Sequence, residues 1–113
     1  METKTLTRIL LSLDKIADEN GQFSFADLAS SLGVSKARIS VLMDELVELG
    51  YLKRYSKRLV KIESKGKEAI ASRCREVEAL TSLLQERLGL DENLALEAVL
   101  SLPASVEDKL RNK

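Results

Sequence analysis

The 113-residue sequence contains no histidine and only one cysteine and one proline. Histidine is the side chain that most often moves protons near neutral pH. No nucleophile motif, glycine-rich phosphate loop or pair of cysteines takes its place. The usual machinery of acid–base, covalent and metal catalysis is therefore lacking. We expect a protein that is not an enzyme and has no cofactor.

The single cysteine, Cys74, excludes an internal disulfide bond and is most simply a small buried hydrophobic residue. The apolar runs are too short to cross a bilayer. Glu2 and polar neighbours stand where a leader peptide would carry basic and then apolar residues. We expect one compact domain, located in the cytoplasm and without a membrane partner.

Positive and negative charges are equal in number, but they are unevenly distributed along the chain. Residues 1–34 carry three basic and five acidic side chains, a net charge of −2. Residues 35–67 carry nine and four (+5), and residues 68–113 carry six and nine (−3). A basic middle section is typical of a surface that binds a polyanion, although a solvated charged surface gives the same count.

Apolar spacing predicts three helices in the first half of the chain. Residues Thr5 to Asn20 form the first, with Asn20-Gly21 as its end. Ser24 and Asp27 are a capping pair for a short second helix that ends at Gly33. Ser35 caps a third helix that ends at Gly50. The inward positions of the third helix are Ile39, Leu42, Leu46 and Leu49.

From residue 51 to residue 63 the period changes to an alternation that predicts two short antiparallel strands, with Ser56-Lys57 at the tip. Ser64 is expected to cap a long helix that stops at Gly89. Its apolar positions are Ile70, Cys74, Val77, Leu80, Leu84 and Leu88. Asp91 begins another helix through Leu94, Ala98 and Leu102, and Ser105 with Asp108 caps a final short one.

Three helices, a tight glycine turn and a hairpin describe a winged helix-turn-helix, so the predicted fold is mainly α with a small β-hairpin. The third helix is the element that enters the major groove of double-stranded DNA. Opposite its apolar stripe it presents short polar or basic side chains that allow a close approach to base edges. We call this surface the recognition face: Ser35, Lys36, Ala37, Arg38, Ser40 and Val41.

Four of these positions have an expected contact. Arg38 suits a guanine edge, because its planar fork reaches two acceptors, while Ala37 and Val41 suit thymine methyl groups. Ser24 and Lys36 lie at helix starts, where backbone N–H groups attract phosphate. In the hairpin we expect phosphate or minor-groove contacts, with a tyrosine as hydrogen-bond donor. The hairpin residues are Lys53, Arg54, Tyr55, Lys57 and Arg58.

An alternative is a winged-helix adaptor that binds proteins and makes no direct contact with DNA. The recognition face, the basic hairpin and the charge segregation coincide in one region, and this coincidence favours DNA.

The order and spacing from Leu6 to Ser105 resemble the iron- and manganese-dependent repressors of the diphtheria toxin repressor type. The similarity rests on "GQFSFADLASSLGVSKARISVLMDELVELGYLKRY", "LVKIESKGKEAI" and "LLQERLGLDENLALEAV". It implies a transcriptional repressor that binds a palindromic operator as a homodimer. Residues 1–66 would form the winged helix-turn-helix region and residues 67–113 the helical dimerisation region.

The metal site of those repressors does not carry over to this chain. Its first-helix carboxylates would fall at Arg8 and Leu11, and its histidine at Val77. The ligands of the next helix would fall near Ala98, Leu100, Pro103 and Ala104. Apolar or cationic groups stand in place of carboxylates and imidazoles, so we expect no metal site. Burial of Leu11 and Val77 is then expected to join the first helix to the dimerisation helices.

Overall fold

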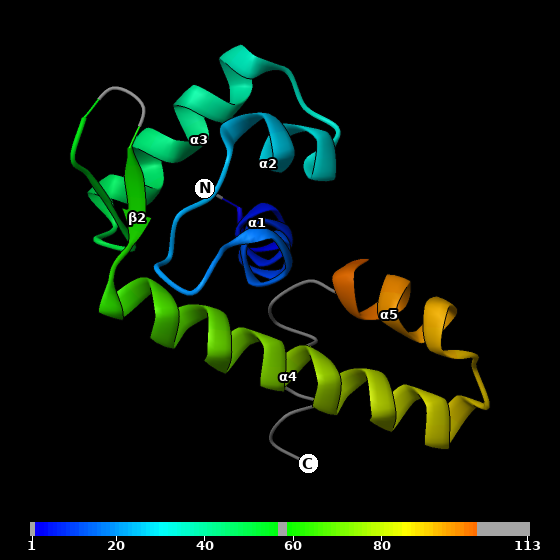
Figure 1. Ribbon diagram of the computed structural model, residues 1–113. Helices are drawn as coiled ribbons and strands as arrows, with labels where there is room; N and C mark the ends of the chain where they lie inside the picture. The colour runs from blue at the N-terminus through cyan, green and yellow to red at the C-terminus, as the bar shows by residue number, and fades with distance from the viewer. Residues whose placement is uncertain (1, 57–58, 102–113) are drawn as a thin grey trace.

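The computed structural model describes residues 2–56 and 59–101, and it confirms a mainly α fold with a small β-hairpin (Figure 1). The elements are α1 (Thr3–Ile16), α2 (Phe25–Leu32), α3 (Lys36–Glu48), β1 (Leu52–Arg54), β2 (Val60–Ile62), α4 (Ser64–Leu88) and α5 (Glu92–Ser101). Within the described ranges, no helix combines the length and apolar character that crossing a bilayer requires. The predicted helix capped by Ser105, and Lys57 at the hairpin tip, lie outside the described residues.

The caps of α2 and α3 agree with the sequence prediction. The Ser24 hydroxyl accepts the Asp27 N–H at 3.3 Å, and the Ser35 hydroxyl accepts the Arg38 N–H at 3.2 Å. Gly33 closes α2 in the left-handed conformation, with a φ of 68°. These local signals fix the turn between the two helices.

Two helix ends differ from the prediction. The first helix ends at Ile16 and not at Asn20, because the Asp18 carboxylate accepts the N–H groups of Asn20 and Gln22 and holds a turn there. Ser64 is the first residue of α4 and does not cap it, since Glu63 occupies the N-cap position without a side-chain hydrogen bond.

The two strands pair antiparallel, with Leu52 opposite Ile62 and Lys53 opposite Lys61. The loop before α2 adds to the edge of this hairpin: Gln22 forms a bridge with Lys61, and the Ile62 N–H donates to the Gly21 carbonyl. Sequence alternation predicts the strands but not this extra pairing. It ties the hairpin, which we call the wing (residues 52–62), to the end of α1.

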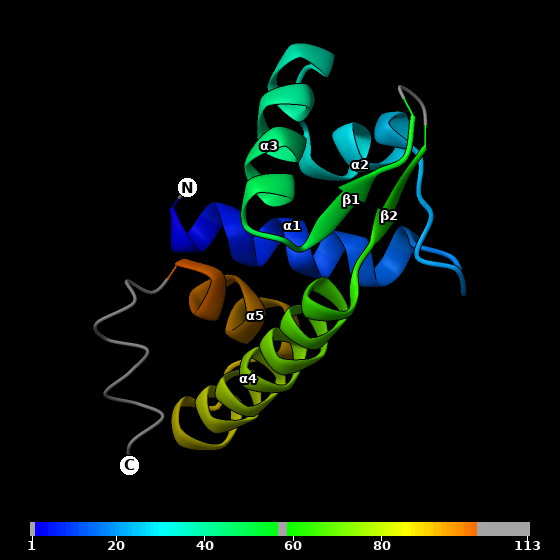
Figure 2. The same ribbon diagram turned by 90° about the vertical axis from the view of Figure 1, so that its left-hand side faces the viewer.

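Helices α2 and α3 lie on one side of α1, and α4 and α5 lie on the other (Figures 1 and 2). Two hydrophobic clusters include residues of α1. The larger one joins α1, α2, α3, the wing and the start of α4. The smaller one consists of Val77, Leu80 and Val99, with Leu11, Leu84 and Leu96 packed against it. Two predicted inward positions are wrong: Leu49 caps the end of α3 and is 41% exposed, and Leu88 at the end of α4 is 65% exposed.

The first turn of α4 sits directly on the start of β1. The Glu63 N–H donates to the Tyr51 carbonyl at 2.9 Å, and Gly66 is buried against the same carbonyl. A Cβ at residue 66 would overlap the Tyr51 carbonyl oxygen and stand 2.9 Å from Ile62 Cγ2. Glycine is therefore required at residue 66, because the Tyr51 backbone lies too close for a side chain.

We predict that Gly66→Ala lowers the free energy of unfolding by about 1–3 kcal/mol. Displacing the Tyr51 backbone costs more free energy than the better helix propensity of alanine returns. Urea denaturation followed by circular dichroism measures this. Ser72→Ala, an exposed substitution on the same helix, is the control and should change stability by less than about 0.5 kcal/mol. Equal stabilities for Gly66→Ala and wild type would contradict the packing.

Candidate nucleic-acid interface

The residues of the recognition face are exposed to solvent. On its inner side α3 is anchored by Ile39, Leu42, Met43 and Leu46, none more than 2% exposed. On the other side Ser35, Lys36, Ala37, Arg38, Ser40 and Val41 are all exposed, and Val41 is 49% exposed although it is apolar. All six predicted positions are therefore accessible to solvent at the start of α3.

The start of α3 adds backbone groups to this surface. Ser35 uses its side chain to bind the Arg38 N–H and its carbonyl to bind the Ile39 N–H. The N–H groups of Lys36 and Ala37 precede these in the first turn, where N–H groups point along the helix axis toward an anion. Ser24 is exposed at the equivalent place in α2, with its hydroxyl engaged in the cap.

The wing presents Lys53, Arg54 and Tyr55 to solvent, while Lys57 and Arg58 lie outside the described residues. The Tyr55 ring is flanked by two ammonium groups, with Lys53 Nζ at 5.3 Å and Lys61 Nζ at 5.4 Å from its centroid. Such cation–π contacts hold positive charge in place on a surface. Sequence analysis missed Lys61, which reaches this group because it lies opposite Lys53 in the strand register.

An ion pair joins the wing to α3. Arg54 Nη2 lies 3.1 Å from Asp44 Oδ1, and their side chains are 39% and 70% exposed. An exposed pair of this kind contributes less than about 1 kcal/mol to stability, so its effect is mainly to orient the arginine. Asp44 lies ten residues before Arg54 in the sequence, and no spacing rule signals the contact.

Four of the positions that the resemblance to iron-dependent repressors implies for a metal lie along one groove or in the cluster beside it. Arg8, Leu11 and Leu100 line one groove, and Leu11 packs against the cluster that contains Val77. Their chemistry does not fit a metal, since they offer a guanidinium and aliphatic carbons. Among the described residues, no three histidine, cysteine or acidic side chains are grouped to hold an ion. Pro103 and Ala104 lie outside the described range.

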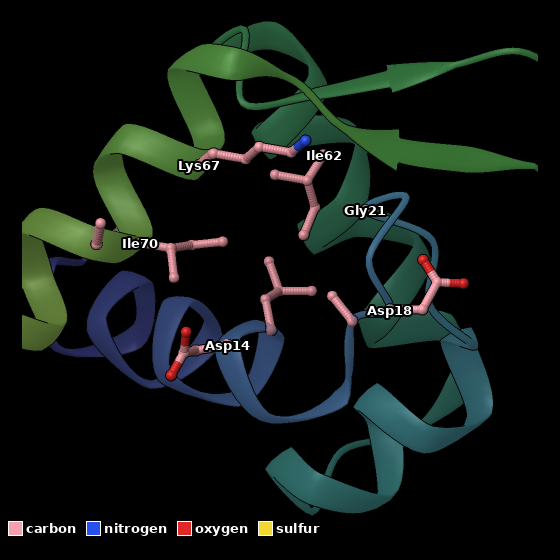
Figure 3. Close-up of a pocket in the computed structure, with 9 residues that line it drawn as sticks. Asp14, Asp18, Gly21, Ile62, Lys67 and Ile70 are labelled. Atoms are coloured by element: carbon pink, nitrogen blue, oxygen red, sulfur yellow. The ribbon is translucent and has the colours of Figure 1, made fainter.

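A cavity of about 250 Å³ separates the start of α4 from the end of α1. Figure 3 shows the Ile62 and Ile70 side chains pointing into it, with Asp14, Asp18 and Lys67 around it. Asp18 already binds two backbone N–H groups of its own loop. The polar groups therefore do not converge on a common point, and we assign this cavity no binding role.

The Cys74 thiol is part of the α1–α4 contact. Burial raises its pKa above the ordinary value, and the Asp14 carboxylate, which is negatively charged and hydrogen-bonded to the thiol, raises it further. Glu78 acts in the same direction by its charge. The thiol is therefore protonated at neutral pH and is a poor nucleophile.

Comparison with known proteins agrees with this geometry. Residues 3–52 match the family described as Helix-turn-helix domain. No curated protein matches the chain. The family match supports DNA binding as the class of function.

Three solved structures show the extent of the shared fold. The hypothetical protein SSo2273 from Sulfolobus solfataricus superimposes with a TM-score of 0.68 at 21% identity, over 99% of this chain and 88% of that one. IdeR from T. acidophilum gives 0.64 at 14% identity, over 96% of this chain and 52% of that one. A candidate transcriptional regulator from Pseudomonas aeruginosa gives 0.59 at 16%, over 100% and 78%. The fold of this chain is thus shared with a candidate transcriptional regulator as well as with a protein without a stated role.

We predict that Cys74 reacts slowly with iodoacetamide at pH 7.5 in the folded protein, and that Asp14→Asn speeds the reaction. Removing the carboxylate lowers the pKa of the thiol and so increases the thiolate fraction. Rates are read by intact mass as a function of pH. Glu97→Gln, an exposed change on α5, is the control and should leave the rate unchanged. A rate in Asp14→Asn equal to wild type at every pH would contradict the assignment.

Proposed function

We propose that this chain is a sequence-specific DNA-binding transcriptional regulator that acts as a homodimer. The observation that carries the proposal is the exposed first half of α3, which is anchored by a buried stripe and flanked by a basic wing. A helix in this setting fits the major groove, while the wing reaches the adjacent backbone. The helix-turn-helix match over residues 3–52 supports the same class of function.

Base reading and phosphate binding are assigned to different residues. Arg38 donates to two acceptors of a guanine, and Ala37 and Val41 contact thymine methyl groups. Lys53, Arg54 and Tyr55 bind phosphates, as do the helix starts at Ser24 and Lys36. In the complex a phosphate competes with Asp44 for the Arg54 guanidinium, so the Asp44–Arg54 pair holds the wing in place before DNA binds.

The homodimer is proposed on the sequence resemblance to iron- and manganese-dependent repressors, and the fold is shared with IdeR from T. acidophilum. Residues 1–66 then form the DNA-binding region, and residues 67–113 form the dimerisation region. Leu88 ends α4 and Leu94 lies in the first turn of α5, and they are 65% and 52% exposed. They provide apolar surface for a second subunit. Two half-sites of a palindrome would lie about ten base pairs apart, or a multiple of that.

Regulation through the metal site of those repressors is not part of the proposal. Leu11 packs with Val77, Leu80 and Val99 where a metal would link the first helix to the later ones. Apolar burial makes this link permanently, whereas coordination makes it only when the ion is present. DNA binding is therefore independent of divalent metal.

A protein-binding adaptor is the second candidate function. It is favoured by Asp44 and Glu48, which are exposed on the later turns of α3 and would repel phosphate. The two functions differ in how binding to DNA responds to salt.

We predict a steep salt dependence of DNA affinity, measured by fluorescence anisotropy with a duplex selected from a random pool. If roughly four to six phosphates are neutralised per subunit, log affinity falls against log salt with a slope of about −4 to −5 for each bound subunit. A weak affinity with a flat salt response would favour the adaptor.

Two substitutions separate base reading from phosphate binding. Arg38→Ala should cost about 1–3 kcal/mol on the selected duplex and little on random DNA, because one base contact is lost. Lys53→Ala should weaken binding to both duplexes alike and reduce the salt slope by about one. Equal losses on both duplexes for both variants would contradict the assigned roles.

Titration of the protein with Mn²⁺ or Fe²⁺ tests metal independence. We expect no tight binding and the same affinity for the selected duplex with and without metal, because Leu11 and Val77 offer no ligand atoms. Anisotropy in the presence of a chelator is the matched measurement. A metal-dependent rise in DNA affinity would show that this part of the proposal is wrong.

A further inference from the structure

The wing has two sides with different chemistry. One side faces the core, because Leu52, Val60 and Ile62 are buried. Side chains alternate between the two faces of a strand, so the positions between these residues lie on the opposite face. We call that face the outer side of the wing; it carries Lys53, Tyr55 and Lys61.

The positive charge of the outer side is not neutralised within the described part of the protein. Lys53 and Lys61 stand directly opposite each other in the strand register, where like charges repel. Neither lysine has an ion-pair partner among the described residues, whereas Arg54, which alternates to the other side, is paired with Asp44. Two opposed ammonium groups without partners favour a binding partner that brings negative charge.

Protection of the sheet edge does not account for Lys61. A lysine on an edge strand prevents pairing with another chain, and this explains Lys53 in β1. Strand β2 is not an edge at this point, because Lys61 pairs with Lys53 on one side and forms a bridge with Gln22 on the other. A different role is therefore needed to explain the charge of Lys61.

The Tyr55 ring holds both ammonium groups close to it. Lys53 Nζ lies 5.3 Å and Lys61 Nζ lies 5.4 Å from the ring centroid. A free lysine side chain has many rotamers and loses their entropy when it binds. A ring that orients both ammonium groups in advance by cation–π attraction lowers this cost of binding.

We propose that the outer side of the wing binds the phosphate backbone of double-stranded DNA through Lys53 and Lys61 together, with Tyr55 as the positioning residue. Lys61 is thereby a DNA-contacting residue on the second strand of the wing. The inference rests on the proposed function and deepens it, since the wing then binds DNA with a face of its sheet and not only with residues of β1. Contacts of this kind are made to phosphate and do not depend on base sequence.

Lys61→Gln tests the new contact by fluorescence anisotropy on the selected and the random duplex. Loss of one neutralised phosphate should reduce the salt slope by about one and weaken binding roughly fivefold to tenfold at 0.1 M salt, on both duplexes alike. Lys65→Gln is the matched control, because Lys65 is an exposed lysine outside the wing whose Nζ lies 5.6 Å from the Tyr51 ring centroid. It should change affinity by less than about twofold, since salt screens an exposed charge away from the duplex.

Two substitutions of Tyr55 test its positioning role: Tyr55→Phe keeps the ring and Tyr55→Leu removes it. With phenylalanine at this position, Lys61→Gln should weaken binding as much as it does in wild type. With leucine, the loss from Lys61→Gln should fall to about twofold, because the ammonium group is no longer oriented. No buried side chain is removed, so all variants should melt close to wild type.

Equal effects of Lys61→Gln and Lys65→Gln would overturn the assignment of Lys61. An equal loss from Lys61→Gln with tyrosine, phenylalanine and leucine at residue 55 would overturn the positioning role. Wild-type protein on the same duplex separates this inference from the proposed function. If wild type shows the steep salt response and Lys61→Gln matches it, the inference alone fails; if wild type does not bind the duplex, both fail.

Discussion

The structure depends on α1 being buried on more than one side. Ile9, Leu10 and Leu13 pack into the cluster that carries the helix-turn-helix, while Leu11 packs into the cluster of α4 and α5. Two polar contacts fix its position: the Ser31 hydroxyl donates to the Ser12 hydroxyl at 3.0 Å, and Arg73 Nε donates to the Thr7 hydroxyl at 2.8 Å. Satisfied polar contacts at partly buried positions help to specify a single arrangement of neighbouring helices. This one helix therefore serves as a rigid base that holds the helix-turn-helix and the α4–α5 helices in one arrangement.

That base makes an exposed recognition face possible. The large apolar residues of α3 are buried on one side of the helix. The opposite face can therefore carry small and basic side chains without loss of packing. The wing is held at two places, by pairing with the loop before α2 and by the Asp44–Arg54 contact. A rigid support of this kind reduces the entropy that binding to DNA would otherwise cost.

Local signals in the sequence predicted much of this fold, because caps and glycine turns act over a few residues. Ser24, Ser35, Gly33 and Gly89 appear in the structure as expected. The burial of α5 was not predicted: Leu94 and Ala98 mark one apolar stripe, but the structure buries Ala95 and Val99, and Leu94 is 52% exposed. The segment contains two apolar stripes, and only packing against α4 decides between them. The Asp44–Arg54 contact likewise depends on where the wing folds back.

The proposed function depends on entry of the first half of α3 into a DNA duplex. The most direct measurement is an NMR titration of the ¹⁵N-labelled protein with a short duplex, following each backbone amide. The account predicts that the largest shifts occur at residues 35–41 of α3 and 53–55 of the wing. Shifts concentrated on α4 and α5, with residues 35–41 unchanged, would contradict it.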